Sequence, residues 1–85
     1  MTRYTIYGAS SCWACLRAKD LLERENVVFQ YLDIHKEGIT PADLEELVGQ
    51  PVKSIPQIFH GETYIGGFKA LVKYIEALNE SPIQT

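Results

Sequence analysis

The sequence predicts one α/β domain, residues 1–85, in which a parallel pair of strands and an antiparallel hairpin share a mixed sheet. Two observations carry this prediction. Runs of β-branched and aromatic residues alternate with amphipathic runs of helical period, in the order β-α-β-α-β-β-α. The first three segments have the length of a right-handed βαβ unit, whereas the last two strands are joined by a tight turn.

The first half of the chain supplies the parallel pair. A strand is expected over residues 3–8, a turn of small residues over 8–11 and a helix over 13–25, which Asn26 ends. The run 27–34 is near-continuously apolar, as in a strand inside a covered sheet. The inward face of the helix is expected to hold Ala14, Ala18, Leu21, Leu22 and Glu25, and its solvated face Arg17, Asp20 and Arg24.

The second helix has clear end signals. Thr40 is an N-cap residue, Pro41 suits the first helical position, and Gly49 suits the residue after the last turn. The side chains expected to point inward are Leu44, Leu47 and Val48.

A hairpin and a third helix complete the domain. Strands are expected over residues 57–60 and 63–65, and the turn between them leaves His60 exposed. The last helix opens after Gly67, and residues 80–85 are expected to fray. Its predicted core face is Phe68, Leu71, Val72, Ile75 and Leu78.

Both cysteines of the chain lie in the stretch Ser10-Ser11-Cys12-Trp13-Ala14-Cys15, between the first strand and the first helix. A C-x-x-C pair in this context is typical of a dithiol redox site. Residues three apart on a helix share a face, so the two sulfurs can form a disulfide. At the helix N-terminus, free N–H groups and the helix dipole favour a thiolate and lower a thiol pKa. We therefore expect Cys12 to be the nucleophile and Cys15 the resolving thiol.

Two other uses of the cysteine pair are weaker. A zinc site usually has four ligands, and the two histidines, His35 and His60, are not spaced as partners of the cysteines. No metal site is therefore expected. A purely structural disulfide between Cys12 and Cys15 closes a very short loop and stabilises little.

Charge and hydropathy limit the partners and the compartment. The formal net charge of -3 argues against nucleic acid or an anionic membrane as a partner. No apolar run is long enough to span a bilayer, and Met1-Thr2-Arg3 leads straight into a strand rather than a signal peptide. Without an export signal, the two cysteines are better explained as a redox motif of a reducing compartment than as a secreted disulfide framework. We therefore expect a cytoplasmic protein, and we expect it to be a monomer.

Four stretches, in this order along the chain, resemble the glutaredoxin family. They are the C-x-x-C pair, residues 17–22 of the first helix, the element Ser54-Ile55-Pro56-Gln57-Ile58-Phe59, and the step Tyr64-Ile65-Gly66-Gly67-Phe68. In the family the proline of the third element is cis, so the resemblance implies a cis Ile55–Pro56 bond. The resemblance covers nearly the whole chain. It implies a thioredoxin-like fold, with a four-stranded mixed sheet of order 2-1-3-4 flanked by three helices.

The resemblance also implies the activity, which is thiol–disulfide exchange with glutathione as co-substrate and no bound cofactor. Cys12 and Cys15 would be catalytic. Backbone groups of Ile55, just before Pro56, would bind glutathione, as would the N–H groups of Gly67 and Phe68 at the start of the last helix. The expected substrates are disulfide-containing proteins and glutathione mixed disulfides.

The chain departs from the family pattern at three places. They are Trp13-Ala14 in place of Pro-Tyr between the cysteines, Ala9 in place of a Lys or Arg, and Lys69-Ala70 in place of the acid that binds the glutamyl ammonium. Lys53 and Lys69 can supply positive charge for a glutathione carboxylate, but no residue replaces the acid. Trp13 either packs on a substrate or covers part of the first helix.

These departures keep other functions open. One is an electron donor, for example to ribonucleotide reductase, that a flavoprotein reductase rather than glutathione reduces. Another is a module that holds an iron–sulfur cluster between two subunits through Cys12 and glutathione. Cluster-carrying relatives usually have a single-cysteine Cys-Gly-Phe-Ser motif, which this chain lacks. The glutathione-dependent enzyme is the leading hypothesis.

Overall fold

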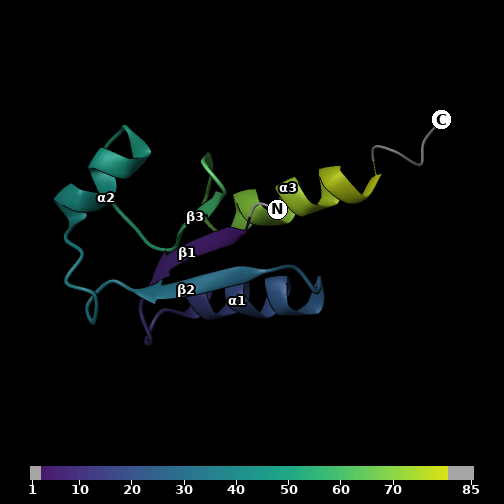
Figure 1. Cartoon of the computed structure of the whole chain (residues 1–85), viewed down its shortest axis with the longest axis horizontal. Helices are drawn as coiled ribbons and strands as arrows, with labels where there is room; N and C mark the ends of the chain where they lie inside the picture. The colour runs from purple at the N-terminus through teal and green to yellow at the C-terminus, as the bar shows by residue number, and fades with distance from the viewer. Residues whose placement is uncertain (1–2, 81–85) are drawn as a thin grey trace.

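The computed structural model of the protein describes residues 3–80, and its helices and strands follow in the predicted order (Figure 1). The elements are β1 (Tyr4–Gly8), α1 (Trp13–Arg24), β2 (Phe29–Asp33), α2 (Pro41–Val48), β3 (Gln57–His60), β4 (Thr63–Gly66) and α3 (Phe68–Glu80). The tail that we expected to fray, beyond Glu80, lies outside the described residues. Within residues 3–80, no helix is long and apolar enough to cross a membrane.

The four strands form one sheet in the order β2-β1-β3-β4. β1 runs parallel to β2 and antiparallel to β3, and β3 runs antiparallel to β4. Ile6 of β1 lies opposite Tyr31 of β2 on one side and Ile58 of β3 on the other. Figure 1 shows β1 and β2 side by side, with α1 running along them. The sheet therefore confirms the predicted strand order, parallel pair and hairpin.

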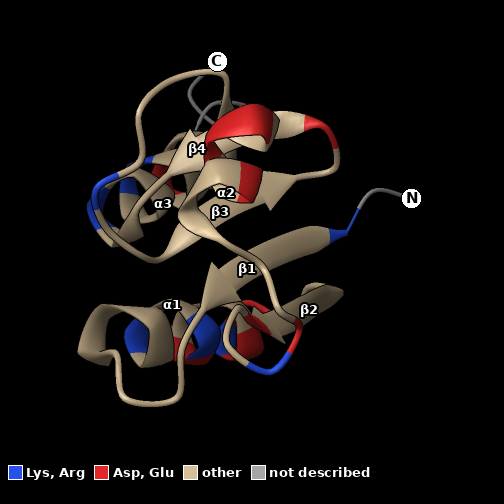
Figure 2. Cartoon of the chain, turned by 90° about the vertical axis from the view of Figure 1, so that its left-hand side faces the viewer, with Lys and Arg blue, Asp and Glu red and all other residues tan. Residues whose placement is uncertain are grey.

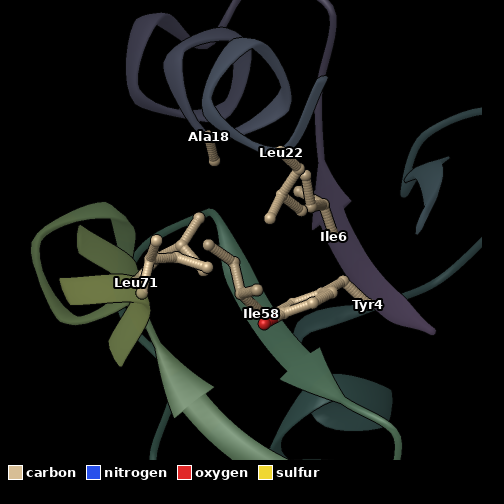
Figure 3. Close-up of a cluster of buried hydrophobic side chains, with 7 residues drawn as sticks. Tyr4, Ile6, Ala18, Leu22, Ile58 and Leu71 are labelled. Carbon is tan, nitrogen blue, oxygen red and sulfur yellow. The ribbon is translucent and has the colours of Figure 1, made fainter. Parts of the chain in front are cut away.

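The hydrophobic core lies between one face of the sheet and the helices α1 and α3. Tyr4 and Ile6 point to this face because residues two apart on a strand share a side. Figure 3 shows their side chains turned toward those of α1, β3 and α3. The buried members of the cluster are Tyr4, Ile6, Ala18, Leu22, Ile58, Leu71 and Ile75.

Helix α2 lies on the other face of the sheet. Thr5 and Tyr7, which alternate with the core residues of β1, line a cavity of about 280 Å³ together with Phe59 of β3 and Leu47 of α2. Helices thus lie on both faces, as the fold class requires. Figure 2 shows that the charged positions of α2 are acidic, whereas α1 carries both signs of charge.

Both ends of α2 have the predicted caps. The Thr40 hydroxyl accepts a hydrogen bond from the Asp43 N–H at 3.1 Å, and the Asp43 carboxylate accepts one from the Thr40 N–H at 2.9 Å. Gly49 follows the helix with a φ of 83°, a left-handed conformation that glycine adopts without steric cost. Asn26 follows α1 in a similar way, with a φ of 60°.

β2 is an edge strand, as the predicted sheet order 2-1-3-4 requires. In the sheet it pairs with β1 alone, and all of its residues, Phe29–Asp33, are half-buried. Phe29 and Tyr31 pack against the core cluster. The apolar residues of β2 therefore cover one side of the core, although neither face of the strand is fully buried.

Three expectations about individual side chains were wrong. Leu47 is 53% exposed because α2 is anchored through the buried Leu44 and leaves an open cavity beneath Leu47. Leu78 is 49% exposed, and Figure 1 shows the end of α3 projecting past the sheet. His60 is half-buried rather than exposed, because β3 still pairs with β1 at that position. Its ring stacks on Tyr4 with centroids 4.0 Å apart.

Candidate active site

Cys12 is the N-cap residue of α1, as the sequence predicts. Its backbone is extended, and its sulfur accepts a hydrogen bond from the N–H of Cys15 at 3.2 Å. The Cys12 thiol lies 3.7 Å from the backbone carbonyl oxygen of Ile55, to which it donates. Cys12 is half-buried, so its sulfur can be approached by a second molecule. A negative charge formed on this sulfur meets the positive end of the helix.

Cys15 lies one turn further along α1 and is fully buried. Burial raises the pKa of the Cys15 thiol to about 12, because the interior disfavours the thiolate, and the hydrogen bond with Cys12 adds to the rise. Both cysteines are free thiols in the structure. The pair therefore joins one accessible sulfur to one enclosed sulfur on the same turn, which is the arrangement that intramolecular disulfide exchange needs.

Gly8 and Tyr31 enclose Cys15 from the side of the sheet. A Cβ atom on Gly8 would lie 2.8 Å from both the Cys15 sulfur and the Tyr31 hydroxyl oxygen, so only a glycine fits. The Tyr31 hydroxyl donates a hydrogen bond to the Ala9 carbonyl at 2.9 Å. Neither residue was predicted at the site from the sequence, in which Gly8 marks the start of a turn and Tyr31 is one residue of an apolar strand.

The loop at Ile55 and Pro56 faces the cysteine pair. The Ile55–Pro56 peptide bond is cis, as the family resemblance implies, and Pro56 is buried. Gly67 lies against this loop, because a Cβ atom on it would be 3.8 Å from the Pro56 carbonyl oxygen. Phe68 follows as the first residue of α3, whose first N–H groups have no partner within the helix. The structure thus brings the backbone candidates for glutathione binding to one side of Cys12.

The side-chain candidates are exposed. Trp13 is 79% exposed beside Cys12, so its ring does not serve as a cover for α1 and is open to a substrate. Lys53 precedes the Ile55 loop and Lys69 lies in the first turn of α3, and both are exposed. Trp13 adjoins Cys12 in the chain, Lys53 lies two residues before Ile55, and Lys69 follows Phe68.

A pocket of about 220 Å³ between α1 and the start of α3 is lined by Arg17, Asp20, Arg24 and Phe68. The three charged residues are exposed, as expected for the outer face of α1. Asp20 shares this pocket with Phe68, the first residue of α3. Within residues 3–80, no three His, Cys, Asp or Glu side chains are grouped as a metal site requires.

Comparison with known proteins identifies the family. A family model described as Glutaredoxin matches residues 4–65. Glutaredoxin 1 of Salmonella typhimurium is 49% identical over 67 residues, which cover 73% of this chain and 77% of that protein. Glutaredoxin 1 of Escherichia coli K12 is 42% identical over 76 residues, which cover 84% of this chain and 89% of that protein.

The fold gives the same result. The structure of reduced E. coli glutaredoxin is similar with a TM-score of 0.82 at 38% identity, covering 93% of this chain and 99% of that one. The oxidised form of that protein has a TM-score of 0.81 at 37% identity, over the same shares of both chains, 93% and 99%. With these matches and the Cys12–Cys15 pair at the start of α1, this chain belongs to the glutaredoxin family of thiol–disulfide oxidoreductases.

Proposed function

We propose that this protein reduces protein disulfides and glutathione mixed disulfides with electrons from glutathione, through Cys12 and Cys15. One observation carries the proposal above the others. The half-buried Cys12 caps α1 and faces the Ile55 carbonyl at 3.7 Å, while Cys15 is enclosed one turn behind it. A substrate disulfide can reach the first sulfur and not the second, which assigns the nucleophile to Cys12 and the resolving thiol to Cys15.

The reaction proceeds by two exchanges. The Cys12 thiolate attacks one sulfur of the substrate disulfide, and the other substrate sulfur leaves with the bonding electrons as a thiolate. Cys15 then loses its proton and attacks the Cys12 sulfur, so that a Cys12–Cys15 disulfide forms and the second substrate thiol is released. Two glutathione molecules reduce this disulfide again by the same exchanges and leave as glutathione disulfide.

Glutathione would bind along the loop and the helix start beside Cys12. The backbone of Ile55 offers hydrogen bonds to the cysteinyl part, and the N–H groups of Gly67 and Phe68 suit a carboxylate at a helix N-terminus. Lys53 or Lys69 would add positive charge for a carboxylate. Trp13, exposed next to the nucleophile, would pack on the bound substrate.

The glutamyl ammonium of glutathione would meet Asp20. The family's usual acid is missing at Ala70, but Asp20 lines a pocket with Phe68 at the start of α3. Arg17 and Arg24 line the same pocket and would attract the α-carboxylate of the same glutamyl group. The ion pair between the Asp20 carboxylate and the glutamyl ammonium would be exposed, and it would therefore contribute roughly 0–1 kcal/mol to binding.

We propose that the protein acts in the cytoplasm, where a reducing environment keeps the cysteine pair reduced. We also propose that it acts as a single-domain monomer and needs no bound cofactor. Disulfide-containing proteins, ribonucleotide reductase among them, are the proposed electron acceptors. A flavoprotein reductase in place of glutathione, and an iron–sulfur cluster held between two subunits, are the competing functions.

Turnover with two electron sources separates these functions. The protein should reduce a glutathionylated peptide and a protein disulfide when supplied with glutathione, glutathione reductase and NADPH, and much more slowly with thioredoxin reductase. Cys12→Ser should abolish both reactions, whereas Cys15→Ser should keep the reaction with the glutathionylated peptide. Faster turnover with thioredoxin reductase would favour the flavoprotein alternative, and visible absorption bands of a purified dimer would favour the cluster.

A further inference from the structure

Tyr31 is a half-buried tyrosine whose hydroxyl reaches the resolving cysteine from β2. The hydroxyl oxygen and the Cys15 sulfur both border the small space above Gly8, at 2.8 Å from where a Cβ atom there would sit. In the structure the hydroxyl donates its hydrogen bond to the Ala9 carbonyl at 2.9 Å. Rotation of the O–H bond about its carbon can turn this proton from the carbonyl toward the space above Gly8 that the sulfur also borders.

Cys15 needs a donor because its chemistry requires a charge in a buried place. Full burial raises the pKa of this thiol, whereas the Ala9 backbone and the Tyr31 hydroxyl beside it act to lower that pKa. Burial also raises the pKa of Tyr31, to about 12, with the neighbouring Cys15 adding to the rise. Tyr31 therefore keeps its proton at neutral pH and remains a hydrogen-bond donor.

We propose that Tyr31 is a positioning residue for the resolving step, in which its hydroxyl turns from the Ala9 carbonyl to donate a hydrogen bond to the Cys15 thiolate. This inference rests on the proposed roles of Cys12 and Cys15. In ring closure, the Cys15 proton passes to solvent or to the departing sulfur, the Cys15–Cys12 bond forms, and the bond from Cys12 to the substrate sulfur breaks. In the reverse exchange, the hydroxyl stabilises Cys15 as the leaving thiolate.

The step can be isolated with a coloured disulfide that needs neither glutathione nor a reductase. When the aromatic disulfide of thionitrobenzoate reacts with the reduced protein, Cys12 releases one coloured thiolate as the mixed disulfide forms. Cys15 releases the second as the ring closes. A stopped-flow trace therefore measures both cysteines in the same molecules, and the first phase reports whether the site is intact.

Tyr31→Phe removes the hydroxyl and keeps the ring. A hydrogen bond to a charged group is strong enough that its loss should slow the second phase roughly ten- to hundredfold while the first phase stays unchanged. The pH at which the second phase accelerates should also move upward. The titratable groups acting on this pair are Cys12 and Asp33, and both stay in the variant. Tyr74→Phe, which removes a part-buried hydroxyl that is hydrogen-bonded to the His60 ring at the end of β3 away from the Ile55 loop, should leave both phases unchanged.

The outcomes decide between a specific and a structural role. A slower second phase with an unchanged first phase and a shifted pH profile supports the proposal. Equal rates in Tyr31→Phe and the original protein overturn it, and so does a loss in both phases, because that would show general damage to the site. Wild-type protein that closes the ring with this probe but does not turn over with glutathione contradicts the proposed function and leaves the role of Tyr31 standing.

Discussion

Gly8→Ala should destabilise the protein through a collision at the active site. The added Cβ atom would lie 2.8 Å from the Cys15 sulfur, 2.8 Å from the Tyr31 hydroxyl oxygen and 2.9 Å from the Cys15 Cβ atom. Two of these three contacts are with the first atoms of a side chain rooted in α1, so the helix or the strand must shift. Overpacking of this kind costs about 1–3 kcal/mol, and a domain of this size loses about 4–8 °C of melting temperature for each kcal/mol.

Thermal unfolding followed by circular dichroism measures this cost. Gly67→Ala is the matched control, because its Cβ atom would meet the Pro56 carbonyl oxygen at 3.8 Å, an ordinary contact. The control should change stability by less than about 1 kcal/mol. If Gly8→Ala melts within 2 °C of the original protein, a threshold of about 0.5 kcal/mol, the close approach of β1 to Cys15 is not as described.

Three further predictions follow from the charges and exposure of the site. Trp13→Ala should change the free energy of unfolding by less than about 0.5 kcal/mol, because the side chain is 79% exposed, but raise KM for a protein disulfide roughly two- to tenfold. Ala70→Asp should lower KM for glutathione and Asp20→Asn should raise it, each by up to about fivefold, and added salt should shrink both effects. Because the pKa of Cys15 is raised from 9.0 to about 12 on folding, the stability that its protonated form contributes is complete below pH 9.0 and is lost toward pH 12. Cys15→Ser should flatten that alkaline decline in denaturant titrations, and an equally steep decline in the variant would contradict the assignment.

The fold was predictable from local patterns because most of its elements have their own start and stop residues. Thr40, Pro41 and Gly49 delimit α2 by hydrogen bonding and backbone geometry that involve few distant residues. The burial of a single side chain was less predictable. Leu47 and Leu78 have the spacing of core residues, but exposure depends on how far the sheet extends beneath each helix, and this is a property of the whole fold.

The candidate site divides in the same way. Cys12, Cys15 and the Ile55–Pro56 loop were predictable because each lies in a short motif whose chemistry depends on residue type and spacing. Asp20 was not, because its helix had to be packed against the start of α3 before it shared a pocket with Phe68. Its spacing on α1 predicted only a solvated acid.

Tyr31 and Gly8 are linked to Cys15 by sheet register. In the parallel pair, Tyr31 lies opposite Ile6, so the two side chains share the face that α1 covers. Gly8, two residues after Ile6, points to the same face, and its missing side chain leaves the space in which the Tyr31 hydroxyl and the Cys15 sulfur approach each other. A shift of one residue in this register would turn Tyr31 to the opposite face. Gly8 therefore does more than begin a turn, because any side chain at this position would fill the space that the Tyr31 hydroxyl and the Cys15 sulfur border.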